Sequence, residues 1–85
     1  MYNKGVAVPC VLVVDKFKVY IYYKDHLPPH IHVIGAGIEI KFLIKNTECI
    51  YARNISLREI TKLRKILQSY QEFFQEKWHE YQDKN

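Results

Sequence analysis

The chain has 85 residues, a length that suits one domain with one hydrophobic core and leaves no room for a second. Of these residues 48% are hydrophobic and 14% aromatic, which excludes an intrinsically disordered chain. The net charge of +4 favours encounters with anionic partners without identifying them. We therefore expect a single ordered domain over residues 1–85, with a sheet at about 8–54 and a helical part at about 56–83.

The apolar stretch at residues 6–14 has the hydrophobicity of a secretory leader. However, it follows a single lysine, contains Pro9 and is shorter than the roughly 20 apolar residues that cross a bilayer. We therefore expect a cytoplasmic protein that does not associate with membranes.

Alternation of apolar and polar side chains predicts strands in the first two thirds of the chain. We expect these strands at residues 11–14, 17–24, 30–34, 38–45 and 48–53. The positions predicted to face inward on the second and fourth strands are Phe17, Val19, Ile21, Tyr23, Ile38, Ile40, Phe42 and Ile44. Because the connections are short, we expect an antiparallel meander of four or five strands.

A capping box marks the start of the helical part, where Ser56 is followed three residues later by Glu59. Apolar residues then recur at three- and four-residue steps as far as Tyr81, which predicts a helical face that covers the sheet. One helix over residues 57–83 would be about 40 Å long. We therefore expect either one long helix or two consecutive helices with a break near residues 69–70, and an α+β fold.

The segment DHLPPHIH at residues 25–32 holds three of the four histidines. Its two prolines favour extended backbone, which predicts a stiff connector between two strands. If Ile31 and Val33 face the core, alternation places His30 and His32 side by side on the opposite face.

Three interpretations of this segment remain open. His30 and His32 could act as acid and base on a phosphodiester, with Asp25 and His26 as weaker catalytic candidates. Alternatively, His30 and His32 could bind a divalent metal ion, with Asp25 or His26 as a third ligand. In the third interpretation the imidazoles are only hydrogen-bonded to backbone or tyrosines, and no cofactor is needed.

Basic and aromatic side chains on the outer side of the predicted sheet suggest contact with RNA bases and phosphates. The candidates are Lys18, Tyr20, Tyr22, Lys24 and Arg53. Outward tyrosines are also ordinary sheet formers, so this interpretation has a purely structural alternative.

The predicted helix offers a surface for a protein partner. Its candidate docking residues are Arg58, Lys62, Lys65, Phe73 and Trp78. The same helix could also join two copies of the chain as a homodimer.

Four stretches together resemble a family of small, uncharacterised bacterial proteins with a domain of unknown function: VPCVLVVDKFKVYIYYKDHLPPHIHV, EIKFLI, ISLREITKLRKIL and FFQEKWHEY. The family is marked by a PPHxHV segment and a C-terminal helix that contains tryptophan. The matching positions here are Pro28, Pro29, His30, His32, Val33, Trp78 and Glu80. Members are often encoded beside an antitoxin-like protein, so the resemblance implies a toxin-antitoxin module and a small protein partner encoded nearby.

We therefore expect a toxin-type component that acts on RNA or another phosphodiester through His30 and His32. Two alternatives remain. One is a non-enzymatic interaction module, either an adaptor or an antitoxin-like subunit. The other is a metal-binding protein that uses Asp25, His30 and His32.

Overall fold

The strands of the sheet are hydrogen-bonded in the order in which they occur in the chain. The computed structural model describes residues 10–82, and its strands are β2 (Cys10–Val14), β3 (Phe17–Tyr20), β4 (His30–Gly35), β5 (Ile38–Leu43) and β6 (Cys49–Arg53). Every neighbouring pair is antiparallel. The predicted meander is therefore confirmed, with five strands, whereas the predicted start of the sheet at residue 8 lies outside the described residues.

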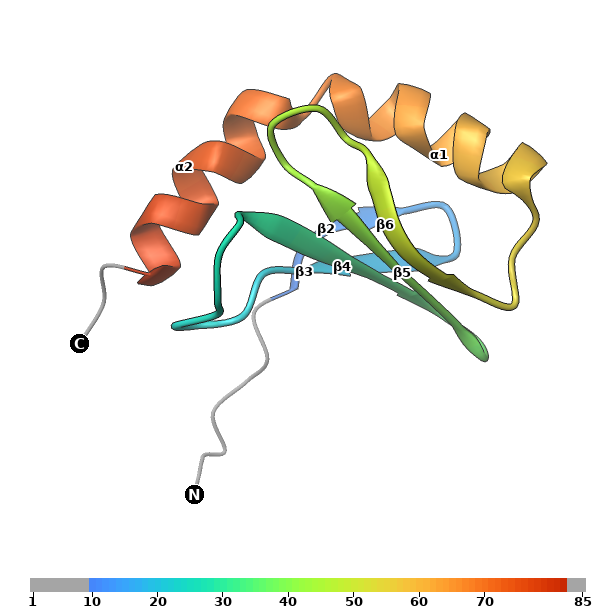
Figure 1. Cartoon of the computed structure of the whole chain (residues 1–85), viewed down its shortest axis with the longest axis horizontal. Coiled ribbons are helices and arrows are strands. Elements are labelled where there is room, and N and C mark those ends of the chain that lie inside the picture. The colour runs from blue at the N-terminus through green and yellow to red at the C-terminus, as the bar shows by residue number, and fades with distance from the viewer. Residues whose placement is uncertain (1–9, 83–85) are drawn as a thin grey trace.

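Two helices, α1 (Leu57–Gln68) and α2 (Gln71–Gln82), follow the sheet and arch over one side of it (Figure 1). The predicted cap is present, because the Glu59 N–H donates to Ser56 Oγ at 3.2 Å. The α+β class is thus confirmed, and the helical part consists of two helices. The predicted end at residue 83 falls just beyond the described part. Neither helix combines the length and the apolar character that a membrane span requires.

The break between the helices has a local cause. The Ser69 N–H and hydroxyl both donate to the carbonyl of Ile66, and the Tyr70 N–H donates to that of Leu67, so the last turn of α1 tightens. The chain then restarts at Gln71, whose side-chain amide donates to the Ile44 carbonyl at 3.0 Å. This bond fixes the start of α2 to the end of β5.

The core lies between the helices and one face of the sheet. Strand register places Val19, Val33 and Ile40 side by side, and all three are fully buried. The helices contribute the buried residues Ile60, Leu63, Leu67, Phe74 and Trp78. The inward position predicted for Tyr23 is wrong, because β3 ends at Tyr20 and the Tyr23 ring is exposed.

The connection between β3 and β4 is a loop over residues 21–29 that returns over the sheet. Lys24 has a left-handed backbone, with φ of 55°, and the Leu27–Pro28 peptide bond is cis. The Gln82 side-chain amide donates to the Tyr22 carbonyl at 2.8 Å, so the last turn of α2 contacts the start of this loop. The segment is therefore a folded loop that connects the two strands, and the predicted continuation of the second strand to residue 24 is wrong because β3 ends at Tyr20.

Candidate functional site

His30 and His32 lie on the face of the sheet that points away from the core. His32 is opposite Tyr20 on β3 and Lys41 on β5, between the core positions of Ile31 and Val33. The rings of His30 and His32 are 4.9 Å apart, as alternation predicts. However, His30 is only 3% exposed and His32 7%. Direct contact between these two rings and a bound phosphodiester is therefore not supported.

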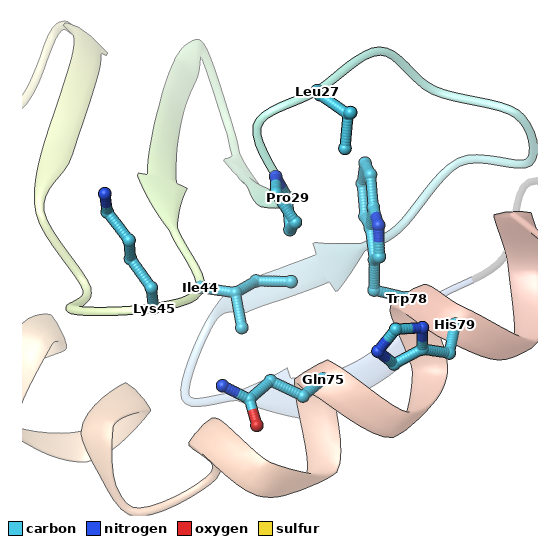
Figure 2. A pocket seen from close by; sticks show the side chains of 7 residues that line it. All are labelled: Leu27, Pro29, Ile44, Lys45, Gln75, Trp78 and His79. Atoms are coloured by element: carbon cyan, nitrogen blue, oxygen red, sulfur yellow. The ribbon is translucent and has the colours of Figure 1, made fainter.

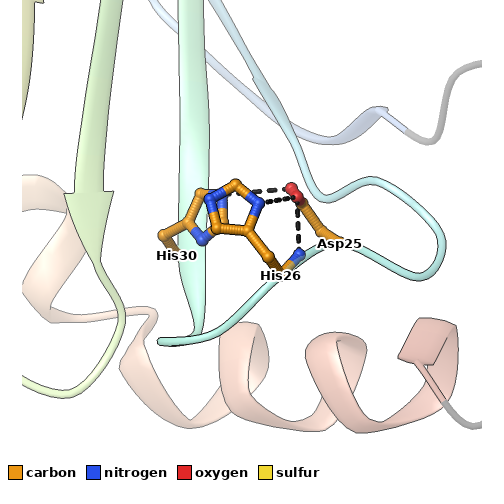
Figure 3. Close-up of side chains that lie close together, drawn as sticks. All are labelled: Asp25, His26 and His30. Atoms are coloured by element: carbon orange, nitrogen blue, oxygen red, sulfur yellow. Dashed lines mark hydrogen bonds and ion pairs between the residues drawn. The ribbon is translucent and has the colours of Figure 1, made fainter.

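Asp25 returns over this face and contacts all three histidines of the loop and strand. Its Oδ2 lies 3.0 Å from His30 Nε2 and 3.1 Å from His32 Nε2. Its Oδ1 lies 3.0 Å from His26 Nδ1 and accepts the His26 backbone N–H at 2.8 Å (Figure 3). We call Asp25, His26, His30 and His32 the Asp25 cluster. His26, predicted as a weaker candidate, is thus part of the site and is its exposed member.

The protonation of the Asp25 cluster follows from burial and hydrogen bonds. Burial raises the pKa of Asp25, but the hydrogen bonds from His32 and the His26 backbone N–H, with the nearby His30, outweigh burial and hold this pKa below its ordinary value. Burial lowers the pKa of His32 by more than its hydrogen bond to Asp25 raises it. A neutral His32 that donates Nε2–H to an ionised Asp25 is therefore favoured.

A pocket of about 280 Å³ lies on the other side of His30, between the loop and α2. Trp78 rises from α2 toward Leu27 and Pro29 and forms one wall of this pocket (Figure 2). The Trp78 ring is also 5.6 Å from the His30 ring, so it lies between the pocket and the cluster. Trp78 is only 5% exposed and is part of the core, so its burial does not support its predicted role in docking a partner.

The other predicted docking residues are distributed over both helices. Arg58, Lys62 and Lys65 are exposed on α1. Phe73 on α2 is partly buried, and its ring has the Lys77 ammonium 5.8 Å from its centre. These residues do not belong to the Asp25 cluster.

Only some of the residues that were predicted to contact RNA lie close together in the structure. Tyr20 and Tyr22 stack with ring centres 6.0 Å apart, and Tyr22 also lies 4.4 Å from the His32 ring. Lys18 and Arg53 lie one row further along the sheet. Lys24 is in the loop and belongs to no strand.

Sequence reasoning missed two residues on this face, Lys41 and Tyr51. Strand register places Lys41 beside His32 on β5 and Tyr51 beside Lys41 on β6. The alternation that turned Ile40 and Phe42 inward also turns Lys41 outward, so the signal for it was present in the sequence. We call Tyr20, His32, Lys41 and Tyr51 the outer row.

Comparison with known proteins identifies the family of the chain but assigns no activity to it. The family model described as a domain of unknown function, DUF4160, matches residues 17–79. The chain belongs to the DUF4160 family. The matched part of this DUF4160 domain begins at β3 and ends within α2, so it contains the whole Asp25 cluster, the outer row and Trp78. No curated protein and no solved structure matches the chain.

Proposed function

We propose that this domain binds single-stranded RNA on the outer face of its sheet and acts on phosphodiester bonds at the Asp25 cluster, as a toxin-type component would. The outer row is the observation that carries the proposal. It sets Tyr20, His32, Lys41 and Tyr51 side by side across four neighbouring strands. Because His32 belongs to both the outer row and the Asp25 cluster, a strand bound along the row would pass beside the cluster.

The aromatic rings of this face suit unpaired bases. The rings of Tyr20 and Tyr22 are nearly parallel, with an interplanar angle of 11°. At the other end of the row Tyr51 is 41% exposed on β6, the last strand of the sheet. Bases stack on such rings only when they are free of a duplex, so this surface favours a single strand.

Positive charges accompany the rings. Lys41 Nζ is 5.3 Å from the centre of the Tyr51 ring, and Lys18 is exposed one row away. The carboxylate of Glu39 is 3.8 Å from Arg53, so it neutralises one cation of this face. The remaining charges can contact backbone phosphates while bases stack on the tyrosines.

The proposal is tested by fluorescence anisotropy of a labelled ten-nucleotide oligouridylate at low salt in the presence of a chelator. The substitution Tyr51→Ala should weaken binding about ten-fold, because base–aromatic stacking is worth about 1–3 kcal/mol per base. Tyr51→Phe keeps the ring and should bind as the wild type does. Tyr70→Ala is the matched control, since Tyr70 is similarly exposed, at 38%, on the helical side.

Equal losses in Tyr51→Ala and Tyr70→Ala, or equal affinity for a duplex of the same length, would contradict the proposed RNA surface. Oligothymidylate of the same length shows whether the 2′-hydroxyl contributes to binding.

Cleavage of the RNA chain is measured separately on gels without chelator. An RNA that Asp25→Asn binds and leaves intact, while the wild type cuts it and arrests growth on expression, supports the toxin-type role. If the wild type binds RNA and leaves both RNA and growth unaffected, the non-enzymatic interaction module is the better description.

A further inference from the structure

The two nitrogens of the His30 ring have fixed and different partners. Nδ1 lies 2.8 Å from the Pro28 carbonyl oxygen, which can only accept, so Nδ1 carries a proton. The other ring nitrogen, Nε2, is therefore the atom that can act as a ligand, and it lies 3.0 Å from Asp25 Oδ2. His30 is only 3% exposed, so a cation held between this nitrogen and the carboxylate would be shielded from solvent. That cation is either a second ring proton or a metal ion.

His26 distinguishes between these two cations. One donor atom from each of Asp25, His26 and His30 lies within 4.8 Å of the other two. A proton shared by one nitrogen and one oxygen needs no third donor, whereas a metal ion is bound by three or more. With metal–ligand bonds of about 2.0–2.2 Å, neighbouring donors lie about 3–3.5 Å apart. His26 Nδ1 lies 3.0 Å from Asp25 Oδ1 and His30 Nε2 lies 3.0 Å from Asp25 Oδ2, distances close to this range for a carboxylate that binds through both oxygens.

We infer that Asp25, His26 and His30 bind a divalent transition-metal ion of the Zn²⁺ type. Two imidazoles and one carboxylate form a ligand set that such ions use and that Mg²⁺ and Ca²⁺ do not favour. The Pro28 carbonyl orients the His30 ring by accepting its second N–H, as metal-bound histidines require. This set differs from the sequence prediction because it combines Asp25 with His26 and excludes His32.

His32 has a positioning role at this centre. Its Nε2 lies 3.1 Å from Asp25 Oδ2, and because a carboxylate oxygen accepts, the ring donates its N–H to that oxygen. A hydrogen-bonded carboxylate keeps a fixed orientation toward its metal. His32 therefore holds Asp25 in place and is not itself a ligand.

Three protein ligands leave coordination positions for water. The His26 side chain is 79% exposed, so these positions open toward solvent at the edge of the outer face. A metal-bound water is deprotonated far more easily than bulk water, and the resulting hydroxide can attack a phosphodiester. The attack forms an oxygen–phosphorus bond and breaks another, and the leaving oxygen takes up a proton. This hydrolytic role of the metal ion rests on the proposed function, whereas metal binding itself does not depend on RNA binding.

The test uses untagged full-length protein, stripped with chelator, dialysed and titrated calorimetrically with Zn²⁺, Mn²⁺ and Mg²⁺ in the absence of RNA. We expect about one Zn²⁺ per chain and no measurable Mg²⁺ binding. Asp25→Asn and His30→Ala should each weaken Zn²⁺ binding at least 100-fold. His32→Gln, which keeps a donor near Asp25, should weaken it only about 10- to 100-fold. His79→Ala is the matched control, because His79 is the histidine outside the cluster, and it should have no effect.

Asp25→Asn preserves shape, so a folded variant by circular dichroism keeps the test valid even if His30→Ala does not fold. Zn²⁺ binding that is equally weakened by His79→Ala, or is unaffected by Asp25→Asn, would overturn the inference. So would a stoichiometry far below one in the wild type. RNA binding measured in chelator is independent of these outcomes, so failure of the metal site and failure of the RNA surface are distinguishable.

Discussion

At the scale of single residues, the carboxylate of Asp25 determines the local structure of the site. Oδ2 contacts the buried rings of His30 and His32, and Oδ1 contacts the exposed His26. Because the histidines come from both the loop and β4, one side chain joins the loop to the strand. Loss of that carboxylate would leave buried N–H groups without an acceptor.

Asp25→Ala is therefore expected to lower the free energy of unfolding of the metal-free protein by about 1–3 kcal/mol, the usual cost of buried polar groups left unpaired. Asp25→Asn retains one acceptor oxygen and should lose less. Urea denaturation of the chelator-treated protein measures both values. Glu72→Ala, an exposed change on α2, should stay within about 0.5 kcal/mol of the wild type, and a similar change for Glu72→Ala and Asp25→Ala would contradict the expectation.

At the scale of elements, each helix is positioned by a few hydrogen bonds at its ends. Ser56 begins α1, Ser69 ends it, and Gln71 fixes the start of α2 to β5. Since α1 covers the sheet with Ile60, Leu63 and Leu67, its stability is part of the stability of the whole core. A weakened cap should therefore destabilise the domain and not only fray one turn.

Ser56→Ala removes the acceptor of the Glu59 N–H and should cost about 1 kcal/mol of stability. Ser56→Asp restores an acceptor and also places a negative charge at the helix start, so it should be neutral or slightly stabilising. The midpoints of thermal unfolding of the two variants provide the comparison. If alanine and aspartate have the same effect, the cap does not contribute as described.

At the scale of the whole molecule, the net charge of +4 and the cations of the outer face should govern how RNA binding responds to salt. If Lys18 and Lys41 each contact one phosphate, the logarithm of affinity should fall with the logarithm of salt concentration with a slope of about −1.4, because a single strand contributes about 0.7 per contact. Lys41→Ala should reduce this slope by about 0.7. Anisotropy titrations at several salt concentrations measure it, and a slope near zero would indicate that the outer face does not contact phosphates.

The whole fold was more predictable from sequence than the site. Alternation of apolar and polar residues identified the buried faces around Val19 and Ile40, because successive side chains of a strand point to opposite faces of the sheet. Alternation also placed His30 and His32 on the correct face. Alternation did not show that His30 and His32 are buried, because the side chains that cover these rings belong to the loop that carries Tyr22 and Asp25. Trp78 belongs to the apolar helical face that was predicted to cover the sheet, and its burial agrees with that periodicity better than with a docking role.

The bond between Gln82 and the Tyr22 carbonyl joins the last turn of α2 to the loop that carries Asp25 and His26. The packing of α2 and the order of this loop are therefore linked equilibria, and by reciprocity whatever stabilises one stabilises the other. A ligand that orders the loop would hold α2 more firmly against the sheet, and a partner that displaced α2 would loosen the loop. The position of the last turn of α2 is thus connected, through this loop, to the geometry of the Asp25 cluster.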